Sequence, residues 1–216
     1  MIGDPPSTAQ LNSIPDGFVR DLAALGRVRS YPRHTVFITE GDSSDSVFVV
    51  LTGKVKIFIS DTEGHEMILD THGPGDYVGE MALDGKPRSA SVMTLEPSTF
   101  SVVQREPLLE AIRKKPDFAF EIIARIIDRA RLATNSVKDL ALLDVYGRVA
   151  RLLLNMAVEK DGKLLIPEKL TQQEIAERVG ASRDMVSRIF RDLTAGGYIT
   201  VESRHITINK KPPARW

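Results

Sequence analysis

The feature that most constrains the fold is a long run, residues 117–146, that contains neither glycine nor proline. Glycine and proline are the residues that most strongly disfavour a helix interior, so the run predicts one long helix. Along it, apolar or small side chains recur at alternating spacings of four and three residues, as in the seam of a coiled coil. The seam comprises Ile123, Ile127, Ala130, Thr134, Val137 and Ala141.

A helix of this length must rest its seam on another surface. Short strands offer it no partner of matching length, so we expect a parallel copy of the same helix in a homodimer. Packing of the seam on the β-rich part of the same chain is the alternative. Thr134 places a hydroxyl inside the seam, which indicates either a contact that fixes the register or a bound ligand.

The residues before this helix predict a β-rich domain. Short apolar and β-branched runs alternate with glycine-containing turns, which is the pattern of a sandwich or barrel. The chain before residue 30 is more mixed, and a rough helical stripe there consists of Val19, Leu22, Ala23 and Val28. The strand-like runs are 36–38, 47–51, 54–59, 67–69, 77–78, 90–92 and 100–103.

After the long helix, residues 170–193 have the pattern of a helix-turn-helix. Thr171 and Glu174 form a capping box, and Gly180 lies where the turn requires a left-handed backbone. Ser182 is expected to cap the second helix. The side chains expected to face inward are Ile175, Ala176, Val179, Val186, Ile189, Phe190 and Leu193.

The outer face of the second helix is basic, which indicates nucleic acid. Arginine can donate two hydrogen bonds to guanine, and aspartate can accept one from cytosine, in the major groove. Runs 198–201 and 205–208 predict a hairpin that makes the module winged and whose tip reaches phosphates. A plain helical hairpin with a solvated charged face is the alternative. The residues expected at DNA are Thr171, Gln172, Ser182, Arg183, Asp184, Ser187, Arg188 and Arg204.

The charge is divided unevenly along the chain. There are 29 Lys+Arg and 29 Asp+Glu, so the net charge is zero. Residues 1–143 carry 16 basic and 20 acidic side chains, whereas residues 144–216 carry 13 and 9. A modestly basic second part predicts weak sequence-independent affinity for DNA, so discrimination must depend on a few base contacts.

Several functional classes are disfavoured. The absence of cysteine excludes disulfides, thiolate metal sites and a cysteine nucleophile. No apolar run reaches the length of a membrane helix, and the first residues do not resemble a signal peptide, so we expect a cytoplasmic protein without a membrane partner. An enzyme with zinc on His34, His65 and His72 is an alternative, but surface histidines are the simpler interpretation.

Residues 79–90 indicate an anion site. A glycine and an acid, Gly79 and Glu80, are followed after a glycine turn by Arg88 and Ser89. A buried arginine with a hydroxyl and free backbone N–H groups suits a phosphate diester, and a carboxylate nearby suits a ribose hydroxyl. Because Arg-Ser pairs are common, a purely structural role is the alternative.

The chain from about residue 18 to 210 resembles the CRP/FNR family of bacterial transcription regulators. The resemblance rests on residues 79–81, 88–89 and 143–148 and on the helix-turn-helix. It implies an α+β fold with a jelly-roll-like β-roll that binds a cyclic nucleotide, a long dimerisation helix and a C-terminal winged helix-turn-helix. Those parts span residues 1–115, 116–143 and 144–216. It also implies a homodimer that acts with RNA polymerase on a palindromic operator with TGTGA-like half-sites.

The resemblance further implies which residues hold the ligand. The family member that binds cyclic AMP offers two small polar residues to adenine, at the positions of Ala133 and Thr134. Ala133 has no hydroxyl, so Asn135 is the expected substitute, and that member has Glu where this chain has the shorter Asp184. Cyclic AMP is the expected ligand, with cyclic di-GMP or loss of ligand control as alternatives. The expected ligand residues are Gly79, Glu80, Met81, Arg88, Ser89, Thr134 and Asn135.

Overall fold

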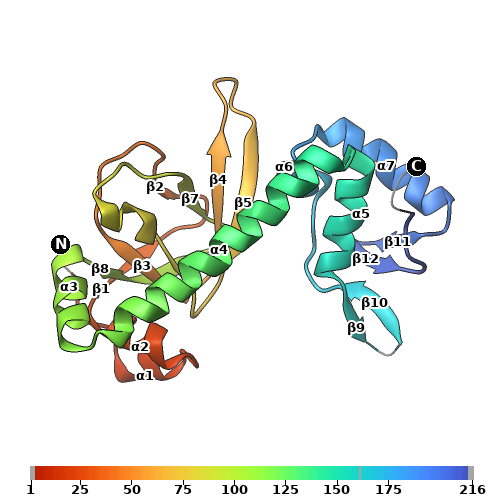
Figure 1. Cartoon of the computed structure of the whole chain (residues 1–216). Coiled ribbons are helices and arrows are strands. Elements are labelled where there is room, and N and C mark those ends of the chain that lie inside the picture. The colour runs from red at the N-terminus through yellow and green to blue at the C-terminus, as the bar shows by residue number, and fades with distance from the viewer. Residues whose placement is uncertain (1–2, 161, 214–216) are drawn as a thin grey trace. The chain divides into compact units, whose positions relative to one another are not determined.

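The computed structural model describes residues 3–160 and 162–213, in two compact units (Figure 1). The division falls inside the long helix α4 (Asp117–Leu142), between Asp128 and Arg129. The outer ends of the predicted domains, Met1 and Trp216, lie outside the described residues. The division of the chain into three parts at 115/116 and 143/144 stays a prediction.

The N-terminal unit is a β-roll made of two antiparallel four-stranded sheets. The strand orders are β1-β8-β3-β6 and β2-β7-β4-β5. The strands are β1 (Arg27–Tyr31), β2 (Val36–Ile38), β3 (Val47–Thr52), β4 (Val55–Ser60), β5 (Glu66–His72), β6 (Tyr77–Val78), β7 (Ser91–Thr94) and β8 (Ser98–Val103). The helices are α1 (Thr8–Asn12), α2 (Gly17–Ala24), the 3₁₀ helix η1 (Glu80–Asp84) and α3 (Arg105–Lys114).

Strand β3 explains the layers of this unit, because it is buried on both faces. Successive side chains of a strand point to opposite sides. Phe48 and Val50 belong to the core between the two sheets, whereas Val47 and Val49 belong to a second core shared with α2, α3 and the start of α4. The unbroken apolar run that predicted this strand is therefore typical of a strand that is packed on both faces.

Two expectations for this unit need correction. Val19, Leu22 and Ala23 are buried on α2 as predicted, but Val28 lies in β1 and not on a helical stripe. The reason is pairing with a distant segment, since β1 runs antiparallel to β8 along its whole length. Helix α3 was not predicted at all.

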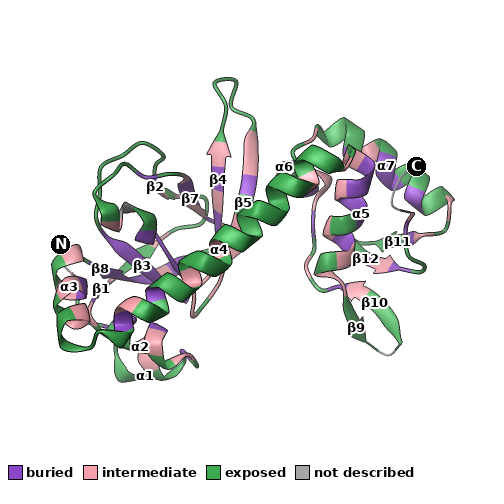
Figure 2. Cartoon of the chain, viewed as in Figure 1, coloured by how far each residue is buried: buried purple, intermediate pink, exposed green. Residues whose placement is uncertain are grey.

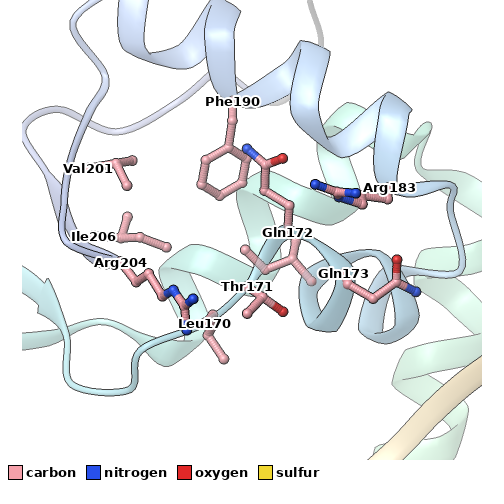
Figure 3. Close-up of a pocket in the computed structure, with 10 residues that line it drawn as sticks. Leu170, Thr171, Gln172, Gln173, Arg183, Phe190, Val201, Arg204 and Ile206 are labelled. Atoms are coloured by element: carbon pink, nitrogen blue, oxygen red, sulfur yellow. The ribbon is translucent and has the colours of Figure 1, made fainter.

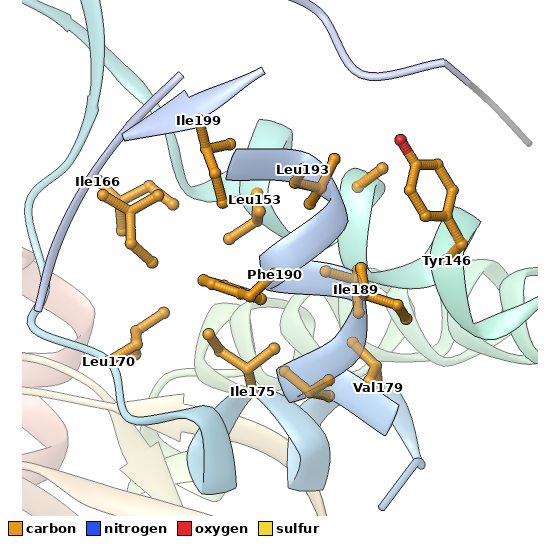
Figure 4. Close-up of a cluster of buried hydrophobic side chains, with 14 of the residues drawn as sticks. Tyr146, Leu153, Ile166, Leu170, Ile175, Val179, Ile189, Phe190, Leu193 and Ile199 are labelled. Carbon is orange, nitrogen blue, oxygen red and sulfur yellow. The ribbon is translucent and has the colours of Figure 1, made fainter. Parts of the chain in front are cut away.

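The C-terminal unit is a winged helix-turn-helix, as predicted. Its apolar residues from three helices and the sheet form one core (Figure 4). The sheet order is β11-β12-β10-β9, and its first two strands form the wing. The elements are α5 (Val145–Met156), β9 (Val158–Lys160), β10 (Lys163–Ile166), α6 (Gln172–Val179), α7 (Arg183–Ala195), β11 (Ile199–Glu202) and β12 (His205–Ile208).

Helix α4 buries apolar side chains near its beginning. Phe118 and Ile122 are buried against the β-roll, and Arg125 pairs with the Asp16 carboxylate at the start of α2. Beyond that point the helix is largely exposed (Figure 2). All six seam residues are exposed, and the two that belong to the first unit, Ile123 and Ile127, do not pack on the β-roll, which was the alternative. The exposed fractions of the larger ones are 49 % at Ile123, 46 % at Ile127 and 65 % at Val137.

Candidate functional site

The first candidate site is a pocket in the β-roll where β6 meets the 3₁₀ helix. Its polar lining was predicted from the sequence, since all five β-roll ligand residues of the prediction lie there together. Its apolar wall was missed, because strand residues of this kind look like ordinary core in a sequence. The lining residues are Gly79, Glu80, Met81, Arg88, Ser89 and Ala90, with Ile38, Ile57, Val78 and Val92 from the strands.

Arg88 is the central group of this pocket. Its side chain is buried, with 5 % of the residue exposed. Nη1 donates to Gly79 O at 2.6 Å, and Nη2 donates to Ser46 O at 2.8 Å. Nε is buried without a hydrogen-bond partner in the described chain. A buried charge with an unused donor is costly unless an anion accompanies it, so the arrangement fits a phosphate.

The electrostatics of the pocket agree with this interpretation. Burial lowers the pKa of the Arg88 guanidinium, while the carboxylates of Asp45 and Glu80 act to raise it. Glu80 is itself buried, with 5 % exposed. The pocket therefore combines one desolvated cation with one desolvated carboxylate. That pair matches a ligand with a single anionic group and a hydroxyl.

Position 79 requires a glycine, both because of its backbone conformation and because of the atoms around it. Its φ is +90°, a conformation that L side chains rarely adopt. A Cβ there would lie 2.6 Å from Arg88 Nη1 and 2.9 Å from Ser46 O. The glycine therefore allows its own carbonyl and the guanidinium to approach each other.

The remaining predicted ligand residues differ in their surroundings. Ser89 Oγ donates to Met81 Sδ at 3.3 Å, and Met81 is 61 % exposed. Thr134 and Asn135 are exposed on α4, in the part that belongs to the C-terminal unit. The Thr134 hydroxyl donates to Ala130 O of its own helix at 2.9 Å.

The second candidate site is the outer surface of the helix-turn-helix. The local signals that predicted this motif are confirmed. Thr171 and Glu174 form the capping box of α6, and Gly180 ends that helix with φ 62° and ψ 55°. The Ser182 hydroxyl accepts from Met185 N at 3.2 Å and caps α7. The seven residues predicted to face inward are all buried.

The residues predicted to contact DNA lie on this surface. Arg183, Asp184 and Arg188 are exposed on α7, with Ser187 partly exposed. Four predicted residues from three elements line one pocket between α6, α7 and the wing. Figure 3 shows Arg183 and Arg204 on opposite sides of it, with the start of α6 between them. Those four are Thr171, Gln172, Arg183 and Arg204.

Arg148 links the segment between α4 and α5 to the helix-turn-helix, a contact that the sequence did not reveal. Its Nε donates to Val179 O at 2.8 Å, and its Nη2 donates to Gly180 O at 3.3 Å. Its Nη1 donates to Leu143 O at 2.9 Å. One side chain therefore fixes the turn of the motif to the segment that precedes α5.

The histidines do not form a metal site. Within residues 3–160 and 162–213, no group of three histidine, aspartate or glutamate side chains is placed to hold a metal ion. His65 instead contacts Asp61 at 2.9 Å in an exposed turn. Among the described residues, none of the helices combines the length and the apolar composition that a membrane span requires.

Comparisons with known proteins identify the domain that contains each candidate site. A cyclic nucleotide-binding domain model matches residues 28–115, and a Crp-like helix-turn-helix domain model matches residues 147–212. A "CRP-like cAMP-activated global transcriptional regulator" of Mycobacterium tuberculosis is 35 % identical over 185 residues, which is 83 % of this chain and 82 % of that protein. The "cAMP-activated global transcriptional regulator CRP" of Escherichia coli is 32 % identical over 187 residues, or 84 % and 89 %.

A solved structure supports the fold. The "c-di-GMP Responsive Global Regulator CLP" of Xanthomonas campestris superimposes with a TM-score of 0.78 at 24 % identity. The match covers 90 % of this chain and 99 % of the other. The relatives are transcription regulators and not enzymes, so the alternative of a zinc enzyme is wrong.

Proposed function

The chain belongs to the CRP/FNR family of transcription regulators, and we propose that it is a homodimeric regulator whose binding to DNA is controlled by cyclic AMP. The observation that carries the proposal is the buried Arg88 with its unused Nε donor, beside Glu80, in a domain of the cyclic nucleotide-binding type. When bound, the nucleotide supplies a phosphate for the arginine and a ribose hydroxyl for the carboxylate.

A cyclic mononucleotide suits the pocket better than a cyclic dinucleotide. Arg88 is the one cationic side chain among the lining residues given above, and it can neutralise one phosphate. Cyclic di-GMP carries two phosphates, so the second would need another cation. The regulators at 35 % and 32 % identity are named as cAMP-activated, which favours adenine as the base.

On the DNA side, α7 enters the major groove of each half-site of a palindrome. Arg183 and Arg188 donate to guanine, and Asp184 accepts from cytosine, as TGTGA-like half-sites require. The sugar-phosphate backbone of the DNA is contacted by Ser182, Ser187, Thr171, Gln172 and Arg204. RNA polymerase is the partner that turns this binding into regulation, in the cytoplasm.

The exposed seam of α4 supports the homodimer. Apolar side chains at Ile123, Ile127 and Val137 would otherwise remain in water, and a parallel copy of the helix would bury them. We place Thr134 and Asn135 beside the base of the nucleotide. Binding there would shift the two helices and so change the spacing of the two recognition helices, which must be about 34 Å apart.

Isothermal titration calorimetry tests the ligand directly. Wild-type protein should bind cyclic AMP with one site per chain and should bind cyclic di-GMP much more weakly. Arg88→Lys keeps the charge but cannot serve Gly79 O, Ser46 O and a phosphate together, so it should bind cyclic AMP at least about tenfold more weakly. Arg27→Ala, an exposed arginine on β1, is the control and should bind normally. Equal binding by the Arg88 variant would contradict the proposal.

A further inference from the structure

A loop far from Arg88 in the sequence holds that arginine in place. The loop is 41–46, between β2 and β3. Its backbone joins that of the arginine twice, since Gly41 N donates to Arg88 O and Arg88 N donates to Asp42 O, both at 2.9 Å. Nη2 donates to Ser44 Oγ at 2.7 Å, and Ser46 Oγ lies 3.3 Å from Nη2. The two hydroxyl oxygens are 3.1 Å apart.

These contacts determine which donors of Arg88 are left for a ligand. Nη2 carries two hydrogens, and three oxygens of the loop share them: Ser44 Oγ, Ser46 O and Ser46 Oγ. Nη1 gives one hydrogen to Gly79 O. Nε therefore remains for an anion, because it is buried without a hydrogen-bond partner in the described chain.

The loop is separate from the wall of the pocket. The lining residues in the described chain do not include any of residues 41–46. Ser44 is exposed to solvent, whereas Ser46 is buried, with 7 % of the residue exposed. The Ser44 hydroxyl can therefore act on Arg88 from the solvent side without contributing to the core.

We propose that Ser44, together with Ser46, is a positioning residue for the effector phosphate. The two serines hold the Arg88 guanidinium in one orientation before a ligand arrives, so that its free Nε donor is already fixed in direction. Such preorganisation raises affinity because binding then costs less side-chain entropy. The inference rests on the proposed function, since it concerns the phosphate of the same nucleotide.

Ser44→Ala tests the inference in the full-length protein. It removes an exposed hydroxyl and one acceptor of a charged hydrogen bond, so cyclic AMP should bind about tenfold more weakly in calorimetry. Binding of adenosine, which lacks the phosphate, should be unchanged when measured by ligand-observed NMR. Ser44→Thr keeps the hydroxyl and should restore affinity to within about twofold. Ser43→Ala is the matched control, because no hydrogen bond from Ser43 to Arg88 occurs in the described chain.

Ser44→Asp provides a second and stronger test. A carboxylate at this position would pair with Arg88 and compete with the phosphate, so cyclic AMP affinity should fall further than in Ser44→Ala, with no loss of thermal stability. Wild-type affinity for cyclic AMP in both variants would overturn this inference and leave the proposed function intact. An equal loss of affinity for adenosine and for cyclic AMP would do the same. A wild-type protein that binds no cyclic nucleotide would overturn the proposed function instead.

Discussion

Gly79 and Arg88 depend on each other for their positions in the pocket. The arginine reaches the glycine carbonyl at 2.6 Å because no Cβ stands between them. The sequence predicted that both belong to one anion site, since they lie nine residues apart across a glycine turn. It could not predict the support from Ser46, which lies 42 residues away and comes close only when β3 and the pocket have formed.

Replacement of Gly79 by alanine should disturb both the backbone and the guanidinium. The left-handed backbone alone costs about 1–2 kcal/mol for an L side chain, and the new Cβ would displace Arg88 Nη1. Calorimetry should show cyclic AMP binding weakened beyond detection. Gly85→Ala is the matched control, because Gly85 has φ +82° and a Cβ added there would meet nothing within 4 Å. If both variants bound alike, the close contact would be unimportant.

Arg183 tests the base contact on α7. If it donates to one guanine, Arg183→Ala should lose about 1–3 kcal/mol of DNA-binding free energy at that base position only. Fluorescence anisotropy with a set of operators, each changed at one base pair, measures this. Arg191→Ala, on the same helix and also exposed, should change specificity little. An equal loss on every sequence would mean that Arg183 contacts only phosphate.

Among the helices and strands, the two ends of α6 and the start of α7 were the most predictable features. The capping box of α6 involves two residues three apart, and the Gly180 turn follows from one residue's backbone preference. Strand β1 was not predictable, because its partner β8 lies about 70 residues away and its exposed arginines interrupt the apolar pattern. Local signals therefore located the DNA-binding motif, whereas the first strand depended on distant pairing.

The anchoring of α4 to α2 predicts a dependence on pH. The Asp16 side chain accepts from Val19 N at 3.0 Å and pairs with Arg125. Partial burial acts to raise the pKa of Asp16, but these two interactions lower it below its ordinary value. Since the folded pKa is the lower one, the stabilisation is present at neutral pH and is lost as the pH falls through the folded value.

Asp16→Asn should therefore reduce the free energy of unfolding by about 0.5–1 kcal/mol at pH 7, because the pair is partly exposed. The difference from wild type should shrink below about pH 4, where the aspartate becomes protonated. Urea unfolding at several pH values measures it. Asp21→Asn is the control, since Asp21 lies on the same helix with an exposed contact to Lys115 at 3.5 Å. A difference that persisted at low pH would show that the charge is irrelevant.

The seam of α4 should control assembly. Ile127→Glu would place a charge in the proposed helix pair, opposite its own copy, and should convert the dimer to monomers. Sedimentation equilibrium at micromolar concentration measures the molar mass. Leu132→Glu is the matched control, because Leu132 is also exposed on α4, at 58 %, but lies outside the seam. A dimer that survived the change at Ile127 would require another interface.

Charge is distributed unevenly between the β-roll and the winged helix-turn-helix parts of the chain. The zero net charge is the sum of an acidic first part and a basic second part. A small positive excess on the DNA-binding part predicts weak affinity for DNA without base contacts, and in the proposed homodimer the spacing of the two recognition helices would therefore carry much of the control. The spacing of the seam predicted both the seam itself and a second copy of the helix as its partner, and the homodimer stays a prediction.

Control of DNA binding by the nucleotide is tested by the affinity for a palindromic TGTGA-type operator, measured with and without cyclic AMP. Fluorescence anisotropy at fixed salt should show that saturating cyclic AMP tightens binding by the wild-type protein at least about tenfold, a typical size for allosteric coupling. Arg88→Lys should bind the operator as the ligand-free wild type does and should not respond. Operator affinity that is high without nucleotide and unchanged by it would contradict the account.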